Sequence, residues 1–203
     1  IPEITAAKIQ DDSAFEISED KSSFDYFFSI PELSKYSGSK YKAKRQAANR
    51  CQAKYQIEIV NQSNNKDVGA DVLNVVHQWE NLKLKEAKNV NVDYERTATE
   101  RMMHHSTEQE NVIITVAYID GAAVGYSIDE LLPEKFVLSH YFKTLPQYDG
   151  LTEYLNQQVA KKLNKADYLH WNWQQDLNIE SLKRMKLSYR PAFTRKTFTV
   201  TRS

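Results

Sequence analysis

The sequence lacks several features that would place it in a class at once. It has one cysteine, Cys51, so neither an internal disulfide nor a cysteine-rich zinc site is expected, and we predict no metal site. Its longest apolar run, Val112 to Ile119, has eight residues, whereas a membrane-spanning helix needs about 20. The 27 basic and 27 acidic residues cancel, which argues against a general polyanion binder but allows a local basic patch.

The first residues also lack the apolar stretch of a secretory signal peptide, because Glu3, Lys8, Asp11 and Asp12 interrupt them. A single cysteine is compatible with a reducing compartment. We therefore expect a cytoplasmic protein.

What the sequence does contain is a regular alternation of apolar patterns. In 203 residues, 41% of them hydrophobic, a sizeable core can form. Helical spacing predicts helices over 41–55, 67–85, 93–105, 150–163 and 179–186, and apolar or alternating runs predict strands over 24–30, 56–61, 112–119, 122–128, 136–142, 168–173 and 193–201. Asp120-Gly121 predicts a tight hairpin between two of these strands.

This order predicts an α/β (α+β) fold with a mixed, mostly antiparallel sheet and flanking helices. Residues 1–23 are polar and are interpreted as a loosely held lead-in. We expect residues 1–55, the lead-in and the first helix, to pack on a main domain formed by residues 56–203.

The segment from Leu33 to Ile57 is basic without a single acidic residue. It contains seven cations: Lys35, Lys40, Lys42, Lys44, Arg45, Arg50 and Lys54. One interpretation is a solvated helix face. The other is a binding site for phosphates of tRNA, a cofactor or a lipid headgroup, with Lys40, Lys44, Arg45 and Arg50 as the contacts.

Two histidines lie on predicted strands, each at a position that alternates with apolar neighbours. If the strands of His140 and His170 splay apart, both side chains would face one cleft and serve as a general base. The alternative for each is a hydrogen-bonded structural histidine. Asp176 is a further catalytic candidate, and Glu153 is a weaker one. We expect Trp171 and Trp173 to lie in the core.

Two segments resemble a known family. Gly38-Ser-Lys-Tyr-Lys-Ala-Lys-Arg-Gln-Ala-Ala-Asn-Arg50 and Asp176-Leu-Asn-Ile-Glu-Ser-Leu-Lys-Arg-Met-Lys-Leu-Ser-Tyr-Arg-Pro191 are similar to segments of the phosphatidylglycerol lysyltransferase C-terminal domains and of their relatives of unknown function. The likeness covers about residues 15–201. It departs from the family pattern at Ser39, Cys51, Gln175, Asn178 and Ser181.

The resemblance implies a GNAT acyltransferase fold, whose element order matches the predicted one. It also implies a transferase that moves an aminoacyl or acyl group onto an amine or hydroxyl. The acceptor would be a small molecule, a peptide or a lipid headgroup, and a lipid acceptor would place the protein at the inner face of a membrane. The donor would be aminoacyl-tRNA, or acetyl-CoA or another acyl-CoA held at the turn of Gln147, Gly150 and Thr152 before a helix.

Arg184 and Lys186 would lie near the donor, although Arg184 and Asp176 are equally suited to a structural ion pair. A non-catalytic binding domain of the same fold and an acyl-CoA-dependent N-acetyltransferase remain alternatives.

Overall fold

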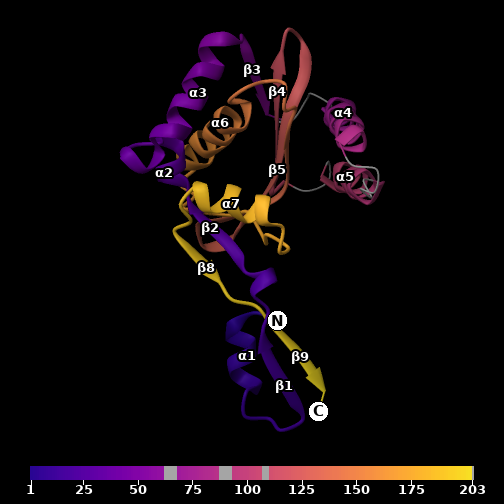
Figure 1. The fold of residues 1–203 in the computed structure, drawn as a ribbon, viewed down its shortest axis with the longest axis vertical. Helices are drawn as coiled ribbons and strands as arrows, with labels where there is room; N and C mark the ends of the chain where they lie inside the picture. The colour runs from indigo at the N-terminus through magenta and orange to yellow at the C-terminus, as the bar shows by residue number, and fades with distance from the viewer. Residues whose placement is uncertain (62–67, 87–92, 107–109, 203) are drawn as a thin grey trace. The chain divides into compact units, whose positions relative to one another are not determined.

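The computed structural model describes residues 1–61, 68–86, 93–106 and 110–202, which form two compact units. The central unit comprises Ile30–Leu169, and the terminal unit joins Ile1–Ser29 to His170–Ser203. Each unit has its own strands and its own helices (Figure 1). The boundary predicted after residue 55 lies inside the central unit, between its helix α3 and its strand β3.

The central unit is built on an antiparallel sheet in the order β3-β4-β5-β6. Its strands are β3 (Ile57–Asn61), β4 (Val112–Ile119), β5 (Ala122–Leu132) and β6 (Phe136–Thr144). Asp120 and Gly121 join β4 to β5 with φ angles of 51° and 78°. Two consecutive left-handed residues are typical of a type I′ hairpin turn, so the predicted hairpin is confirmed.

Helices cover both faces of this sheet (Figure 1). They are α2 (Ile30–Lys35), α3 (Lys42–Lys54), α4 (Gly69–Glu86), α5 (Asp93–Ser106) and α6 (Leu151–Lys165), with short 3-10 turns η2 (Ser39–Tyr41) and η3 (Pro133–Lys135). The Thr144 hydroxyl bonds to Thr152 of α6, whereas the neighbouring Lys143 ammonium lies over the Trp79 ring of α4. Because successive strand residues point to opposite faces, α6 and α4 lie on opposite sides of the sheet.

The terminal unit contains two groups of paired strands. Strand β2 (Asp25–Ser29) pairs antiparallel with both β7 (His170–Asn172) and β8 (Phe193–Arg195), and β1 (Phe15–Glu19) pairs with β9 (Phe198–Arg202). Helices α1 (Glu3–Ile9) and α7 (Glu180–Ser188) and the 3-10 turn η1 (Lys21–Ser23) complete it. The Trp173 ring contacts Phe28, Trp171 and Tyr189, which forms an aromatic core.

The order of elements from β3 to β8 follows the predicted one, and the mixed class with mostly antiparallel strands is confirmed. The lead-in prediction was wrong: residues 15–19 form a strand, because β9 from the other end of the chain supplies its partner. The single strand predicted over 193–201 is two strands, which belong to different sheets. The start predicted for α4, Asp67, lies outside the described residues. No helix of the described chain is long and apolar enough to span a bilayer.

Candidate functional site

A β-bulge places His140 at an irregular point of the central sheet. The register between β5 and β6 changes from Asp129–Ser139 to Ile128–Tyr141, so His140 is the extra residue. Bulges re-aim side chains and are common beside active sites. The His140 side chain is 25% exposed, which leaves it accessible to a bound molecule.

The imidazole of His140 belongs to a short hydrogen-bonded chain. Its Nε2 lies 2.8 Å from Oε2 of Glu130 on the neighbouring strand β5. The other carboxylate oxygen, Oε1, accepts a bond of 3.1 Å from Nδ2 of Asn111, whose backbone oxygen accepts from the Leu131 N–H at 2.7 Å. With a proton on Nε2 donated to Glu130, the Nδ1 of His140 is the basic nitrogen.

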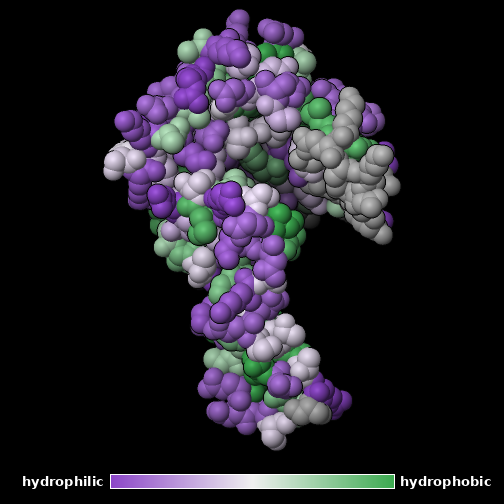
Figure 2. Space-filling model, viewed as in Figure 1, coloured by the Kyte–Doolittle hydropathy of each residue, from purple (hydrophilic) through white to green (hydrophobic). Residues whose placement is uncertain are grey.

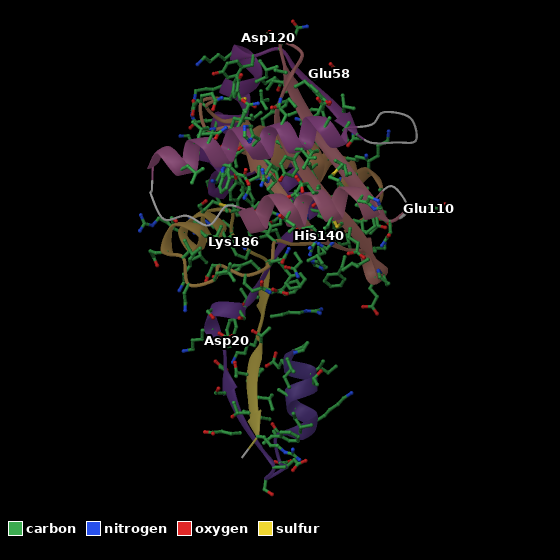
Figure 3. All side chains as sticks on the ribbon, turned by 90° about the vertical axis from the view of Figure 1, so that its right-hand side faces the viewer. Asp20, Glu58, Glu110, Asp120, His140 and Lys186 are labelled. Atoms are coloured by element: carbon green, nitrogen blue, oxygen red, sulfur yellow. The ribbon has the colours of Figure 1, made fainter. Side chains whose placement is uncertain are left out.

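This chain of residues lies on the α4–α5 side of the central sheet, the side that faces the viewer in Figure 3, where His140 is labelled. On β5, the face at Gly125 lies against Leu155 of α6. Side chains alternate along a strand, so Glu130, an odd number of residues away, points to the opposite face. A carboxylate that fixes one nitrogen of a histidine leaves the other to remove a proton, as in catalytic triads. The arrangement therefore suits general-base chemistry.

The turn before α6, where a cofactor phosphate was expected, packs against α3. Gly150 has φ of 76°, and a Cβ there would overlap the Ala47 carbonyl, coming within 2.9 Å of its carbon. Thr152 bonds to Thr144 at 2.6 Å, and Gln147 is exposed. Glycine is thus required for the close approach of α3 as well as for the turn.

The cations of α3 face acidic groups of the same unit. Lys44 Nζ lies 3.2 Å from Oε1 of Glu153, and both side chains are largely buried. Arg50 pairs with Asp149 at 3.6 Å, where both side chains are exposed. Asp149 therefore lies in the loop before α6, and Glu153 lies in the first turn of the helix. A phosphate bound there would be repelled by these two negative charges.

The other two predicted phosphate contacts also have protein partners. Arg45 donates to the carbonyl oxygens of Tyr36 and Gly38, and Lys40 pairs with Glu32 at 2.7 Å. Lys40 and Arg50 remain substantially exposed, and the outer surface around α3 is hydrophilic (Figure 2, upper left). Phosphate binding by these four residues stays a prediction.

Lys186 of α7 is 4% exposed and lies beneath the loop that follows β7. Its Nζ donates to the carbonyl oxygens of Trp173, Gln174 and Gln175 at 2.5, 3.0 and 2.5 Å. Burial lowers the pKa of Lys186 from its ordinary 10.5 to about 8, while the charge of Asp176, and then that of Asp25, raises it. The three protons of the ammonium are matched by three acceptors, which fixes the loop.

Asp176 is buried in the same loop. Its Oδ2 accepts a 2.6 Å bond from the Tyr26 hydroxyl, and its Oδ1 accepts from the Asn178 N–H at 2.9 Å. Burial, followed by the bond to Asp176, raises the pKa of Tyr26 to about 12. Asp176 therefore organises the terminal unit, and its catalytic role stays a prediction.

The remaining predicted residues are placed as follows. His170 lies on β7 and its ring packs edge-on against Phe193, 5.2 Å between centroids, so the two predicted histidines belong to different units. Arg184 pairs with Glu180 at 3.7 Å on the surface of α7, not with Asp176. Among the described residues no group of His, Cys, Asp or Glu gathers in a way that would hold a metal ion.

Sequence reasoning missed Glu130 and Asn111. Neither stands at a recognisable spacing from His140, since the contact depends on the register of two paired strands and on the bulge. A usable signal was present in Glu130, an acidic residue close to the end of a long apolar strand pattern. The hairpin at Asp120-Gly121 would then have limited the residues that Glu130 can meet on the preceding strand, β4, which begins directly after Asn111.

Comparison with known proteins gives a family but little sequence identity. No curated protein matches the chain. A conserved protein of unknown function from Bacteroides thetaiotaomicron has TM-score 0.90 at 21% identity, over 100% of this chain and 68% of its own. The C-terminal domain of a putative lysylphosphatidylglycerol synthetase from Agrobacterium fabrum has TM-score 0.67 at 13% identity, over 98% and 65%. L-PGS from Bacillus licheniformis has TM-score 0.68 at 14% identity, over 100% and 66%.

At these identities the solved structures establish the fold alone, and the chain spans about two thirds of the length of each. The family model described as "Phosphatidylglycerol lysyltransferase, C-terminal" matches residues 4–201, nearly the whole sequence. The expected resemblance is thereby confirmed, and the chain belongs to the phosphatidylglycerol lysyltransferase C-terminal family.

Proposed function

We propose that this chain is a transferase domain that moves an aminoacyl group from the ester of an aminoacyl-tRNA onto a hydroxyl or amine, with His140 as the general base. The observation that carries the proposal is the hydrogen-bonded chain Asn111–Glu130–His140 at the β6 bulge. Membership in a lysyltransferase family supports the same reaction class.

In this reaction Nδ1 of His140 removes the proton of the acceptor hydroxyl or amine as its oxygen or nitrogen attacks the ester carbonyl carbon. The new acyl bond forms, the ester bond to the ribose oxygen breaks, and the proton passes to that leaving oxygen. Glu130 stabilises the imidazolium that exists between the two proton transfers, and Asn111 holds the Glu130 carboxylate in place.

The surroundings of α6 favour a tRNA donor over acyl-CoA. A CoA pyrophosphate at the start of α6 would meet Asp149 and Glu153, and it would have to displace α3 from its contact with Gly150. No comparable cost applies to an ester presented from outside this turn. The exposed cations Lys40 and Arg50 then serve as contacts for the RNA backbone in our proposal.

The test is transfer of labelled lysine from lysyl-tRNA to phosphatidylglycerol vesicles and to free amines, with acetyl-CoA as the competing donor. His140→Gln is expected to lower the rate about 10²- to 10⁴-fold, the usual contribution of a general base. Glu130→Gln is expected to lower it less and to shift the pH–rate profile. His77→Gln, on an exposed part of α4, is the matched control.

A wild-type chain that transfers nothing from lysyl-tRNA would contradict the proposal. So would a His140→Gln variant as active as the control, or acetyl transfer from acetyl-CoA faster than aminoacyl transfer.

A further inference from the structure

Strand β3 is an edge strand of the central sheet. It stands first in the order β3-β4-β5-β6, and β4 is its one strand partner among the described residues. In an antiparallel pair, alternate residues turn their N–H and C=O groups away from the partner strand. The outward groups of β3 therefore have no described strand to bind, and such an edge can accept a strand from another polypeptide.

The edge of β3 also lacks the usual protection against pairing. Proteins shield sheet edges with proline, lysine, bulges or very short strands. β3 has five residues, three of which are Ile57, Ile59 and Val60, and its register with β4 is regular. By contrast, β8, an edge strand of the terminal unit, has three residues and carries Arg195. β3 is thus the edge that is better suited to receive a further strand.

A hollow of about 540 Å³ lies where β3 begins and β4 ends. It is lined by Gln56, Ile57, Glu58, Tyr118, Asp120 and Gly121. Two of these described lining residues carry a carboxylate and none carries a positive charge. Within the described structure neither Glu58 nor Asp120 forms an ion pair. Figure 3 shows both at the end of the central unit where the β4–β5 hairpin turns, away from His140.

Tyr118 forms an aromatic wall of this hollow. It lies opposite Glu58 in the register of β3 with β4, and its hydroxyl donates to Oδ2 of Asp71 on α4 at 2.5 Å. Burial, then the hydrogen bond and the charge of Asp71, then the charge of Glu58, raise the pKa of Tyr118. A ring face beside carboxylates attracts a positively charged side chain. The hollow therefore complements a cation.

We propose that β3 is a docking edge for an extended segment of a partner protein, which adds to the sheet as a further strand and places a lysine or arginine side chain in the hollow beside Glu58. A residue opposite Glu58 on the added strand has its Cβ about 5 Å from that of Glu58, on the same face as Tyr118. Backbone hydrogen bonds to β3 hold the segment, and its cation reaches Glu58 and Asp120.

Charge separates this partner from a second copy of the chain. Antiparallel pairing of two β3 strands about a two-fold axis perpendicular to the sheet would put both Glu58 carboxylates on one face. Like charges that meet across paired strands are destabilising. A segment with a basic residue at this position removes that repulsion.

The probe is a capped peptide, Thr-Thr-Val-Lys-Val-Thr-Thr, whose valines would lie beside Ile57 and Ile59 and whose lysine would lie beside Glu58. Titration into isotope-labelled protein, followed by NMR, is expected to shift the amide signals of β3 and to slow the hydrogen exchange of its outward N–H groups. The same peptide with glutamate in place of lysine is expected to bind at least about tenfold more weakly.

Conservative variants test the hollow. Glu58→Gln is expected to weaken binding of the lysine peptide about threefold, and Glu58→Gln combined with Asp120→Asn about tenfold. The hairpin should persist, because Asn-Gly favours the same turn as Asp-Gly. The matched control is Glu110→Gln, which removes an exposed carboxylate just before β4, at the end of that strand away from the hollow.

Modified peptides test the strand pairing itself. Only alternate N–H groups of an added strand face β3, so N-methylation of one alternate set of peptide amides should abolish binding and N-methylation of the other set should not. A peptide that binds equally with either set methylated does not add as a strand, and the proposal is then wrong.

The proposal is also overturned if the wild type does not bind the lysine peptide, if the glutamate peptide binds as well, or if Glu110→Gln weakens binding as much as Glu58→Gln. Self-association of the wild type that the peptide disrupts would assign this edge to a second copy and overturn it too. The measurements do not use the transfer reaction, so a failure of the chemistry proposed for His140 leaves their outcome unchanged.

Discussion

The two units of this protein use their cations differently. In the central unit, Lys44 and Arg50 of α3 pair with carboxylates of α6 and its turn; the Lys44 pair is largely buried and the Arg50 pair is exposed. In the terminal unit, Lys186 is buried away from water. Within the described structure, its ammonium group donates hydrogen bonds to three backbone carbonyl oxygens. Sequence alone suggested one role, phosphate or donor binding, for all three.

This difference between the two units shows that the burial of a charged side chain decides how much it contributes to the stability of the fold. An exposed ion pair is screened and contributes little, whereas removing a buried cation leaves its acceptors without partners. The exposed Arg50–Asp149 pair should therefore contribute less to the contact between α3 and α6 than the close approach at Gly150 does.

The sharpest test of the comparison is Lys186→Met, which keeps the length of the side chain and removes the ammonium. Three partly buried carbonyls would lose their donor, so we expect the free energy of unfolding to fall by about 3 kcal/mol. Urea denaturation monitored by the fluorescence of the tryptophans measures it. The control is Arg50→Met, which should change stability little; equal losses in the two variants would erase the distinction.

A second test examines the α3–α6 contact with Gly150→Ala. The left-handed backbone at this position costs a residue with a Cβ about 1–2 kcal/mol, and the overlap with the Ala47 carbonyl adds to it. We expect a loss of about 2–3 kcal/mol by the same denaturation measurement. Gly121→Ala, where the φ is similar and no neighbour lies within 4 Å of a Cβ, isolates the steric part. Identical losses at the two glycines would show that α3 does not crowd Gly150.

A third, smaller effect is expected from pH. The pKa of Lys186 is about 8 in the folded chain and about 10.5 when unfolded, so unfolding takes up a proton between these values. The contribution of Lys186 to the free energy of unfolding therefore rises as the pH increases through 8. The rise is about 1 kcal/mol between about pH 7 and pH 9. The difference between wild type and Lys186→Met, followed by urea denaturation at several pH values, should show this rise. A difference independent of pH would mean that the lysine titrates normally.

Much of the central unit could be predicted from local patterns. The hairpin at Asp120-Gly121 and the apolar stripe of α6 depend on residues near in sequence, and both are present as predicted. The pairing of β1 with β9 could not be predicted, because neither strand has a buried face that alternates clearly and the partners are far apart in sequence.

The candidate site was predictable only in part for the same reason. His140 stood out by its residue type, whereas Glu130 acquires its role from strand register and Asn111 from its place before β4. Lys186 stood out as a cation in a family motif, but its burial beneath the carbonyls of residues 173–175 follows from tertiary packing that local charge patterns do not encode.

The pairing of β2 with β7 and β8 has a consequence for synthesis of the chain. Residues 1–29 leave the ribosome before all of the central unit, and the strands that complete their sheets come after it. Phe27 and Phe28 must therefore stay without their final neighbours while the central unit is translated. The pairing of β1 and β2 with their partners therefore waits until residues 170–202 have been translated.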